Sequence, residues 1–225
     1  MTSPIVIREL SNEPELREAL ALQKTIWGFD DADLLPFRML VVATKIGGQL
    51  LGAFHEPSER MIAFCLAIPG LRPGGNPYLH SHMLGVLPEY RNVGVGRQLK
   101  LRQKDDALAR GIDLIEWTFD PLDLKNAYFN IERLGTIVRR YVRNHYGISS
   151  SLLHGGFPTD RCVAEWWIQG PRPRTEITDR IDVPPDIEKA REQQARIADD
   201  FERCFARGLA VVAMDRTSYL LGMAP

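Results

Sequence analysis

The chain has 225 residues, of which 44% are hydrophobic and 25% are charged, and its formal net charge is −1. These proportions are ordinary for a globular protein, and the length allows one domain with elaborations or two small ones. The near-zero net charge disfavours nucleic acid as a partner. No apolar run approaches the ~20 residues that span a bilayer, and the first residues show no signal-peptide pattern. We therefore expect a cytoplasmic protein with no membrane partner.

The three cysteines, Cys65, Cys162 and Cys204, are odd in number, widely separated and without the spacing of metal ligands. This pattern predicts reduced, inert thiols and no bound metal.

The first 70 residues predict a strand, two helices and two further strands. Asn12 is the expected cap of the first helix, with Glu15 as its capping-box partner. The pair Gly47-Gly48 is expected to end the second helix. The expected strands are 5–10, 49–55 and 61–69, and the expected helices are 13–26 and 33–46.

The rest of the chain continues this alternation and then changes in composition. The expected strands are 78–86, 112–119, 136–143 and 161–168, and the expected helices are 95–110 and 124–134. A proline-rich polar linker follows, then a charged helix over 186–207 and short strands at 209–214 and 218–221. We interpret residues 1–170 as one domain and residues 171–225 as a C-terminal extension that packs on it.

The run from Arg91 to Gly96 is the most informative motif, because it lies between an apolar strand and an amphipathic helix. Its glycines, Gly94 and Gly96, remove the side chains that would block an anion, so that successive N–H groups can converge on it. The helix that follows adds the positive end of its dipole. The motif therefore predicts a phosphate-binding loop.

The spacing of the loop distinguishes between phosphate ligands. A dinucleotide fingerprint would need a third glycine where Leu99 stands, and the Walker spacing is missing. The pattern [RQ]-x-x-G-x-[GA] is met by Arg91, Gly94 and Gly96. It resembles the acyl-CoA pyrophosphate loop of the Gcn5-related N-acetyltransferase (GNAT) superfamily, and the resemblance covers roughly residues 5–168. An NAD(P)-dependent enzyme is the disfavoured alternative.

The resemblance implies an α/β (α+β) fold of the GNAT-like acyl-CoA N-acyltransferase type, with a C-terminal helix and strand extension. Its core is a central, mostly antiparallel mixed sheet flanked by helices. The implied co-substrate is acetyl-CoA or another acyl-CoA. The implied acceptor is a small-molecule amine that attacks the thioester directly, and a homodimer is left open.

The resemblance also implies which residues hold the acyl donor. The pyrophosphate is expected at the backbone N–H groups of the loop, and the thioester carbonyl at a backbone N–H in the preceding strand. Asn126 and Asn130 are expected on the helix that follows the next strand, where helix capping is the alternative role of Asn126. The expected donor-binding residues are Leu84, Val86, Arg91, Asn92, Val93, Gly94, Val95, Gly96, Arg97, Asn126 and Asn130.

Three residues are candidates for the base that deprotonates the amine. His80 lies where some members of the superfamily carry a catalytic glutamate, and regular strand alternation would place His82 and Leu84 on its face. A histidine titrates near neutral pH, as a general base requires. Glu116, on the next strand, is the third candidate. For each of them, a satisfied or ion-paired structural group is the alternative.

The acid that protonates the departing thiolate is missing from its usual place. In the superfamily this is a tyrosine four residues before a glycine, and here that position holds Ile131. Tyr128, Tyr141 or Tyr146 are the candidates to replace it, with Tyr141 chosen for the site. The missing acid also supports an alternative function, namely a non-catalytic protein that binds or senses acyl-CoA.

The acceptor is expected to contact the first helix pair and the last strands. Trp27, Phe29 and Asp31 combine aromatic rings with a carboxylate, which suits a cationic amine. His82 and Asp160 complete the expected acceptor residues.

Overall fold

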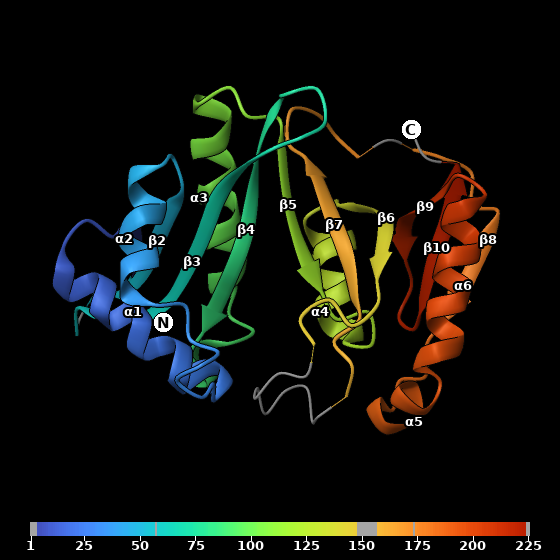
Figure 1. Ribbon diagram of the computed structural model, residues 1–225, viewed down its shortest axis with the longest axis horizontal. Helices are drawn as coiled ribbons and strands as arrows, with labels where there is room; N and C mark the ends of the chain where they lie inside the picture. The colour runs from blue at the N-terminus through green and yellow to red at the C-terminus, as the bar shows by residue number, and fades with distance from the viewer. Residues whose placement is uncertain (1–3, 57, 148–156, 173, 224–225) are drawn as a thin grey trace. The chain divides into compact units, whose positions relative to one another are not determined.

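The computed structural model describes residues 4–56, 58–147, 157–172 and 174–223, drawn in colour in Figure 1. These residues form two compact units, with the division after Ile115. We call the part up to Ile115 unit 1 and the part from Glu116 onward unit 2.

Unit 1 is an antiparallel sheet with helices on both faces. Its strands are neighbours in chain order, β1 to β2 to β3 to β4. The elements are β1 (Ile5–Glu9), α1 (Glu13–Trp27), α2 (Phe37–Lys45), β2 (Gln49–His55), β3 (Arg60–Leu71), β4 (Pro77–Val86), the 3-10 turn η1 (Pro88–Tyr90) and α3 (Val95–Ala109).

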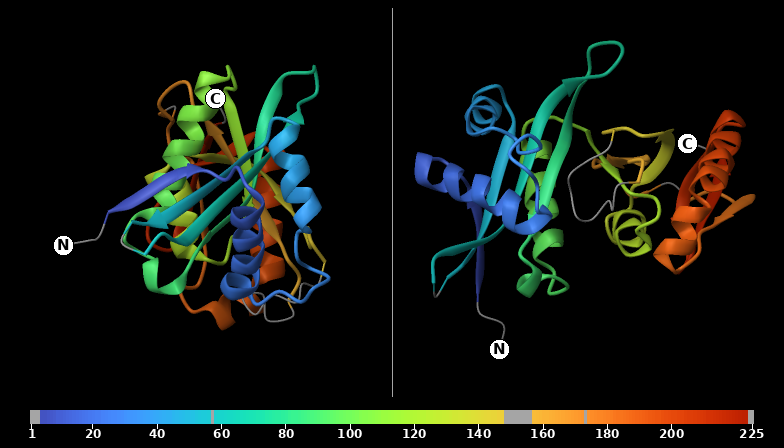
Figure 2. Two further views of the ribbon diagram at one scale, coloured as in Figure 1. Left: turned by 90° about the vertical axis from the view of Figure 1, so that its left-hand side faces the viewer. Right: turned by 60° about the horizontal axis from the view of Figure 1, so that its bottom comes forward.

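Two consecutive residues of β4 show which helix lies on which face. A Cβ on Gly85 would meet the Trp27 ring of α1 at 2.7 Å, whereas Leu84 contacts the start of α3 at Gly96. Because neighbouring residues of a strand point to opposite faces, α1 and α3 cover opposite faces of the sheet (Figure 2). Leu99 of α3 and Leu40 of α2 are fully buried in the core of this unit.

Helix α2 starts later than the sequence pattern predicts. The expected start at residue 33 is wrong, because Pro36 caps the helix in an extended conformation, with φ −62° and ψ 148°. The ring of a proline disfavours helical geometry in the residue before it, here Leu35. The N-terminal cap of α1 is as expected, since Asn12 accepts a hydrogen bond from the N–H of Glu15.

Unit 1 also buries a lysine that no motif indicated. Lys100 of α3 is only 3% exposed, and its ammonium donates to Ser81 Oγ at 2.8 Å and to Gln103 Oε1 at 3.3 Å. The Cys65 thiol lies in the same cluster and accepts from Gln103 Nε2 at 3.2 Å. Burial lowers the pKa of Lys100 to about 8.

This lowered pKa predicts how the stability of the protein depends on pH. Between about pH 8 and pH 10.5 the unfolded chain binds more protons at Lys100 than the folded chain does. The free energy of unfolding should therefore rise with pH over this range, by about 3 kcal/mol. Urea unfolding of the unaltered protein and of Lys100→Met, each at about pH 8 and at about pH 10.5, measures this pH dependence. Equal pH slopes for the two proteins would contradict it.

Unit 2 is a second set of strands, ordered β5-β7-β6-β9-β10-β8, in which β6 pairs antiparallel with β7 and β9, and β10 pairs antiparallel with β9 and β8. Its strands are β5 (Leu114–Phe119, which begins in unit 1), β6 (Ile137–Val142), β7 (Arg161–Trp167), β8 (Asp179–Asp182), β9 (Leu209–Met214) and β10 (Ser218–Met223). Its helices are α4 (Leu124–Tyr128), η2 (Phe129–Arg133), α5 (Ile187–Glu192) and α6 (Gln194–Ala206). The polar linker thus contains β8, a strand that the composition did not predict.

Two helices that were expected to be continuous are broken. The expected helix at 124–134 becomes α4 followed by a π-helix, η2, in which the N–H of Leu134 donates to the carbonyl of Phe129 at 3.1 Å. The expected helix at 186–207 divides at Gln193 into α5 and α6.

The C-terminal residues are part of the core of unit 2. Phe201 of α6 is fully buried and stacks on Tyr141 of β6, with 5.2 Å between ring centroids, and its edge contacts Tyr219 of β10 at 4.9 Å. The Tyr219 hydroxyl donates to the carbonyl of Pro121 at 2.6 Å. The extension therefore shares its hydrophobic contacts with β6 and with the segment after β5.

Candidate functional site

The loop between β4 and α3 has the backbone that an anion site requires. Asn92 and Gly94 have φ values of 66° and 93°, and α3 begins directly after them at Val95. Among the described residues, the N–H groups of Val95, Gly96 and Arg97 donate to no backbone carbonyl, as expected at a helix N-terminus. These three donors and the helix dipole point to the same place.

The two glycines of the loop differ in what surrounds them. A Cβ on Gly96 would lie 3.4 Å from Leu84 Cδ2 and 3.8 Å from Val86 Cγ2, so the N-terminus of α3 lies close against β4. A Cβ on Gly94 would meet no atom of the described part of the chain within 4 Å. The space beside Gly94 is therefore open to a ligand, and its left-handed backbone favours glycine.

The side chains of the loop divide into anchors and exposed groups. Val95 is buried, and Arg91 Nε donates to the Val86 carbonyl at 3.1 Å, which fixes the loop to the end of β4. Asn92, Val93 and Arg97 are exposed and available for contact with a ligand.

Strand β4 contains an irregularity that corrects one expectation. His80 pairs with Ile68 of β3, but Leu84 pairs with Cys65, so three steps along β3 match four along β4. Because cross-strand partners point to the same face, Leu84 lies on the face opposite His80. The expected alternation along this strand is therefore wrong. A bulge of this kind leaves backbone groups without ladder partners and is common beside active sites.

The two histidines of β4 are close neighbours. Their ring centroids are 6.1 Å apart, with His80 half-buried and His82 exposed. Desolvation lowers the pKa of His82 below its ordinary value. A lowered pKa favours the neutral form of the imidazole.

In unit 2, Glu116 belongs to a charged network across three strands. The Glu116 carboxylate of β5 accepts a hydrogen bond from the Arg140 guanidinium of β6. Arg140 also lies 3.6 Å from Glu165 of β7, which in addition binds Arg139. Glu116 and Glu165 are 8% and 4% exposed, and a buried carboxylate is costly unless it is paired in this way. Glu116 is thus an ion-paired carboxylate.

No motif in the sequence indicated this network, because the network depends on a bulge. Val138 pairs with Ala164 and Arg140 with Val163, which leaves Arg139 as an extra residue in β6. The extra residue brings both arginines within reach of Glu165. Strict alternation would have placed them on opposite faces.

Tyr141 and Asp160, which were expected to act separately, form one hydrogen-bonded pair. The Tyr141 hydroxyl donates to Asp160 at 2.8 Å, and Asp160 also accepts from the Asn144 N–H at 2.8 Å. Burial and the neighbouring Asp160 raise the pKa of Tyr141. The phenol therefore keeps its proton, and the proton is directed at Asp160.

Asn130 of η2 is a buried amide with one unused donor. Its Oδ1 accepts from Trp117 Nε1 at 3.2 Å, and its backbone carbonyl accepts from the Thr136 hydroxyl at 2.9 Å. Among the described residues, its Nδ2 has no hydrogen-bond partner, although the side chain is buried. An unpaired buried donor is costly, so a ligand carbonyl at this position would stabilise it. Next to it, Ile131 is fully buried.

Asn126 does not have the capping role considered for it. Asp123 caps α4 by accepting from the Asn126 N–H at 3.1 Å, and the side chain of Asn126 is exposed.

The expected acceptor residues of α1 form an aromatic cluster. The Trp27 and Phe29 rings are stacked at 5.7 Å, and Trp27 packs edge-on against Phe64 at 5.9 Å. Asp31 is exposed and lies 2.5 Å from the Lys24 ammonium, which lowers the pKa of its carboxyl.

Over the described ranges, three further observations concern the site. No group of three or more His, Cys, Asp or Glu side chains is arranged to hold a metal ion. All three cysteines are free and buried. No helix in these ranges is both long and apolar enough to cross a membrane.

Comparison with known proteins identifies the fold. No protein-family model and no curated protein matches the chain. Among solved structures, NAA60 from Arabidopsis thaliana, in complex with a bisubstrate analogue, is 15% identical over 74% of this chain and 99% of that one, with a TM-score of 0.60. A putative acetyltransferase of the GNAT family from Desulfovibrio desulfuricans is 13% identical over 73% and 99%, with a TM-score of 0.56. Aminoglycoside 6'-acetyltransferase type Ii is 22% identical over 75% and 99%, also at 0.56. The chain therefore has the GNAT fold, which confirms the expected fold class.

Proposed function

We propose that the protein is an acyl-CoA-dependent N-acetyltransferase that transfers the acetyl group of acetyl-CoA to a small-molecule amine in the cytoplasm. The observation that carries the proposal is the loop before α3, where three N–H groups without backbone acceptors lie next to the open space at Gly94. A pyrophosphate is the part of CoA that such a loop holds.

The buried amide of Asn130 supports the same donor. The pantetheine arm of CoA contains amide carbonyls, and the unpaired Nδ2 of Asn130 can donate to one of them. The neighbour NAA60 was solved with a bisubstrate analogue, which is consistent with direct transfer between two bound substrates.

The proposed chemistry is a direct attack. The amine nitrogen forms a bond with the thioester carbon, the bond from carbon to sulfur breaks, and CoA leaves as a thiolate. One proton leaves the amine, for which His80 is the proposed base and Glu116 the alternative. Because Ile131 replaces the usual acid and the Tyr141 proton is directed at Asp160, the thiolate leaves without an assigned proton donor.

A small amine is the proposed acceptor. The aminoglycoside acetyltransferase with this fold acts on a small molecule with amino groups. In this chain, the stacked rings of Trp27 and Phe29 offer a surface that attracts a cationic amine.

The test is an acetyl-transfer assay on a panel of polyamines, aminoglycosides, amino acids and peptides. Release of free CoA thiol, together with an acetylated product found by mass spectrometry, would support the proposal. Calorimetric titration with acetyl-CoA, CoA and NADH is the companion measurement. Binding of NADH without binding of any CoA species would overturn it.

The buried Ile131 favours one second function, a protein that binds or senses acyl-CoA without turnover. This alternative shares the donor site and predicts tight CoA binding with no thiol release on any amine. A turnover assay therefore distinguishes the acetyltransferase from the binding or sensing protein, whereas a CoA-binding measurement does not.

The proposed base leads to a prediction for His80→Gln. We expect kcat to fall about 100-fold or more, with the KM for acetyl-CoA little changed, because the loop that holds the donor is intact. The rate of the unaltered enzyme should decrease as the pH falls and the imidazole becomes protonated, and the variant should lack this decrease. The check is steady-state kinetics on His80→Gln and His82→Gln. The pH should be varied between about 5.5 and 9, a range that covers the titration of a histidine. A decrease that is lost only in His82→Gln would move the role to His82.

A further inference from the structure

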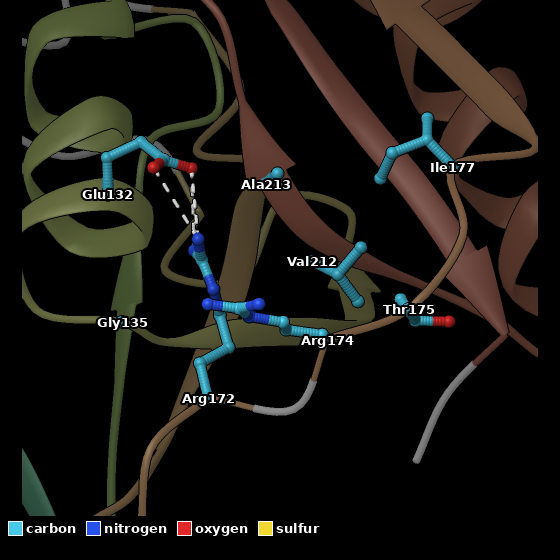
Figure 3. A pocket seen from close by; sticks show the side chains of 8 residues that line it. All are labelled: Glu132, Gly135, Arg172, Arg174, Thr175, Ile177, Val212 and Ala213. Atoms are coloured by element: carbon cyan, nitrogen blue, oxygen red, sulfur yellow. Dashed lines mark hydrogen bonds and ion pairs between the residues drawn. The ribbon is translucent and has the colours of Figure 1, made fainter.

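Unit 2 contains a pocket with no counterpart among the residues proposed for acetyl transfer. Its volume is about 560 Å³, within the ~300–1,000 Å³ typical of small-molecule sites. Figure 3 shows the residues that line it, among them Glu132, Arg172, Arg174, Thr175, Ile177 and Val212. These six come from η2, the polar linker and β9.

The charges in the pocket are unequal. Arg172 is engaged, because it lies 3.4 Å from the Glu132 carboxylate and donates to the Ile131 carbonyl at 2.6 Å. Glu132 also accepts from the N–H of Met214 at 2.8 Å. Arg174, in contrast, forms no ion pair or hydrogen bond with any described residue, and its side chain reaches into the pocket (Figure 3). Two guanidinium groups and one carboxylate leave the pocket with one net positive charge.

The remaining lining is apolar or weakly polar. Val212 is 5% exposed and forms a buried cluster with Ile137 and Ala210, while Ile177 of the polar linker is 42% exposed. The Thr175 hydroxyl donates to the Met223 carbonyl at 3.3 Å, so its oxygen is left as an acceptor. The pocket therefore combines a single uncompensated cation with an aliphatic wall.

We propose that this pocket binds a small organic monocarboxylate, with the carboxylate on Arg174 and its apolar body against Val212 and Ile177. A guanidinium binds a carboxylate through two parallel hydrogen bonds, and a ligand of single charge matches the single excess charge. A bare inorganic anion would leave the aliphatic wall exposed to water. The proposal does not depend on the acetyltransferase assignment.

The experiment is calorimetric titration of the full chain with benzoate and with hexanoate, each in the presence and in the absence of excess CoA. Benzyl alcohol and inorganic phosphate serve as the uncharged and the purely anionic probes. We expect saturable binding of the two carboxylates, and much weaker binding of both control probes. Equal binding of benzyl alcohol, or phosphate binding as tight as that of benzoate, would overturn the proposal.

Two variants locate the site. Arg174→Ala should weaken carboxylate binding at least about tenfold, as expected for a lost hydrogen bond to a charged group. Arg216→Ala is the matched control, because Arg216 is also an exposed arginine of unit 2. It should leave the affinity unchanged. Unchanged carboxylate affinity in Arg174→Ala would overturn the assignment, and so would an equal loss of affinity in both variants. If neither benzoate nor hexanoate binds the unaltered protein, the proposal is wrong.

Discussion

Replacing Gly94 by leucine should raise the dissociation constant of acetyl-CoA about 100-fold or more. The new side chain would project into the open space next to the three free N–H groups of the loop. Two hydrogen bonds to a charged group contribute roughly 3 kcal/mol or more together, and each 1.4 kcal/mol is about tenfold in affinity. Calorimetric titration of the folded variant with acetyl-CoA measures the effect.

The chain offers a closely matched control in Gly74. Its φ value is also 93°, and a Cβ there would also meet nothing within 4 Å. Gly74→Leu therefore carries the same backbone strain, about 1–2 kcal/mol, without touching the loop. We expect it to bind acetyl-CoA as the unaltered protein does. Normal affinity in Gly94→Leu would show that the donor does not bind at this loop.

Replacing Phe201 by alanine should destabilise unit 2 by about 3–5 kcal/mol, the usual loss for a buried phenylalanine. The ring is fully buried between Tyr141 and Tyr219. Since a whole domain is stable by only ~5–15 kcal/mol, this is a large part of the total. Urea unfolding followed by tryptophan fluorescence measures it, because Trp117, Trp166 and Trp167 all belong to unit 2.

Phe205→Ala is the matched control, because Phe205 lies on the same helix but is only half-buried. We expect a clearly smaller loss from it. An unchanged tryptophan transition in Phe201→Ala would contradict a core shared between the C-terminal residues and β6, and would favour an extension that unfolds on its own.

The features that were predictable from sequence depend on local rules. Asn12 capped its helix as expected, because a cap needs only the residues of one turn. The conformation of the loop at Gly94 followed from the permitted geometry of glycine. Helix α2 shows that periodicity alone does not determine where a helix starts. The apolar pattern begins before Pro36, but the helix begins only after it.

The features that were missed depend on one additional residue in a regular element. The bulge in β4 placed Leu84 and His80 on opposite faces, and the bulge in β6 brought Arg139 and Arg140 to Glu165. A strand pattern of period two contains no information on where such a residue is inserted, because the partner strand determines it. The Arg140 partner of Glu116 lies on another strand, and the Asp160 partner of Tyr141 lies directly before β7, so both partners are distant in sequence.

The π-helix η2 can also be regarded as a one-residue insertion within an otherwise α-helical turn. Removing one residue from Phe129–Arg133 would restore ordinary winding and turn the preceding side chains by about 100° relative to those that follow. Asn130 would then turn away from Trp117 although its residue type was unchanged. The direction of the Asn130 amide therefore depends on the length of η2 as much as on its residue types. A single insertion or deletion in η2 would change that direction.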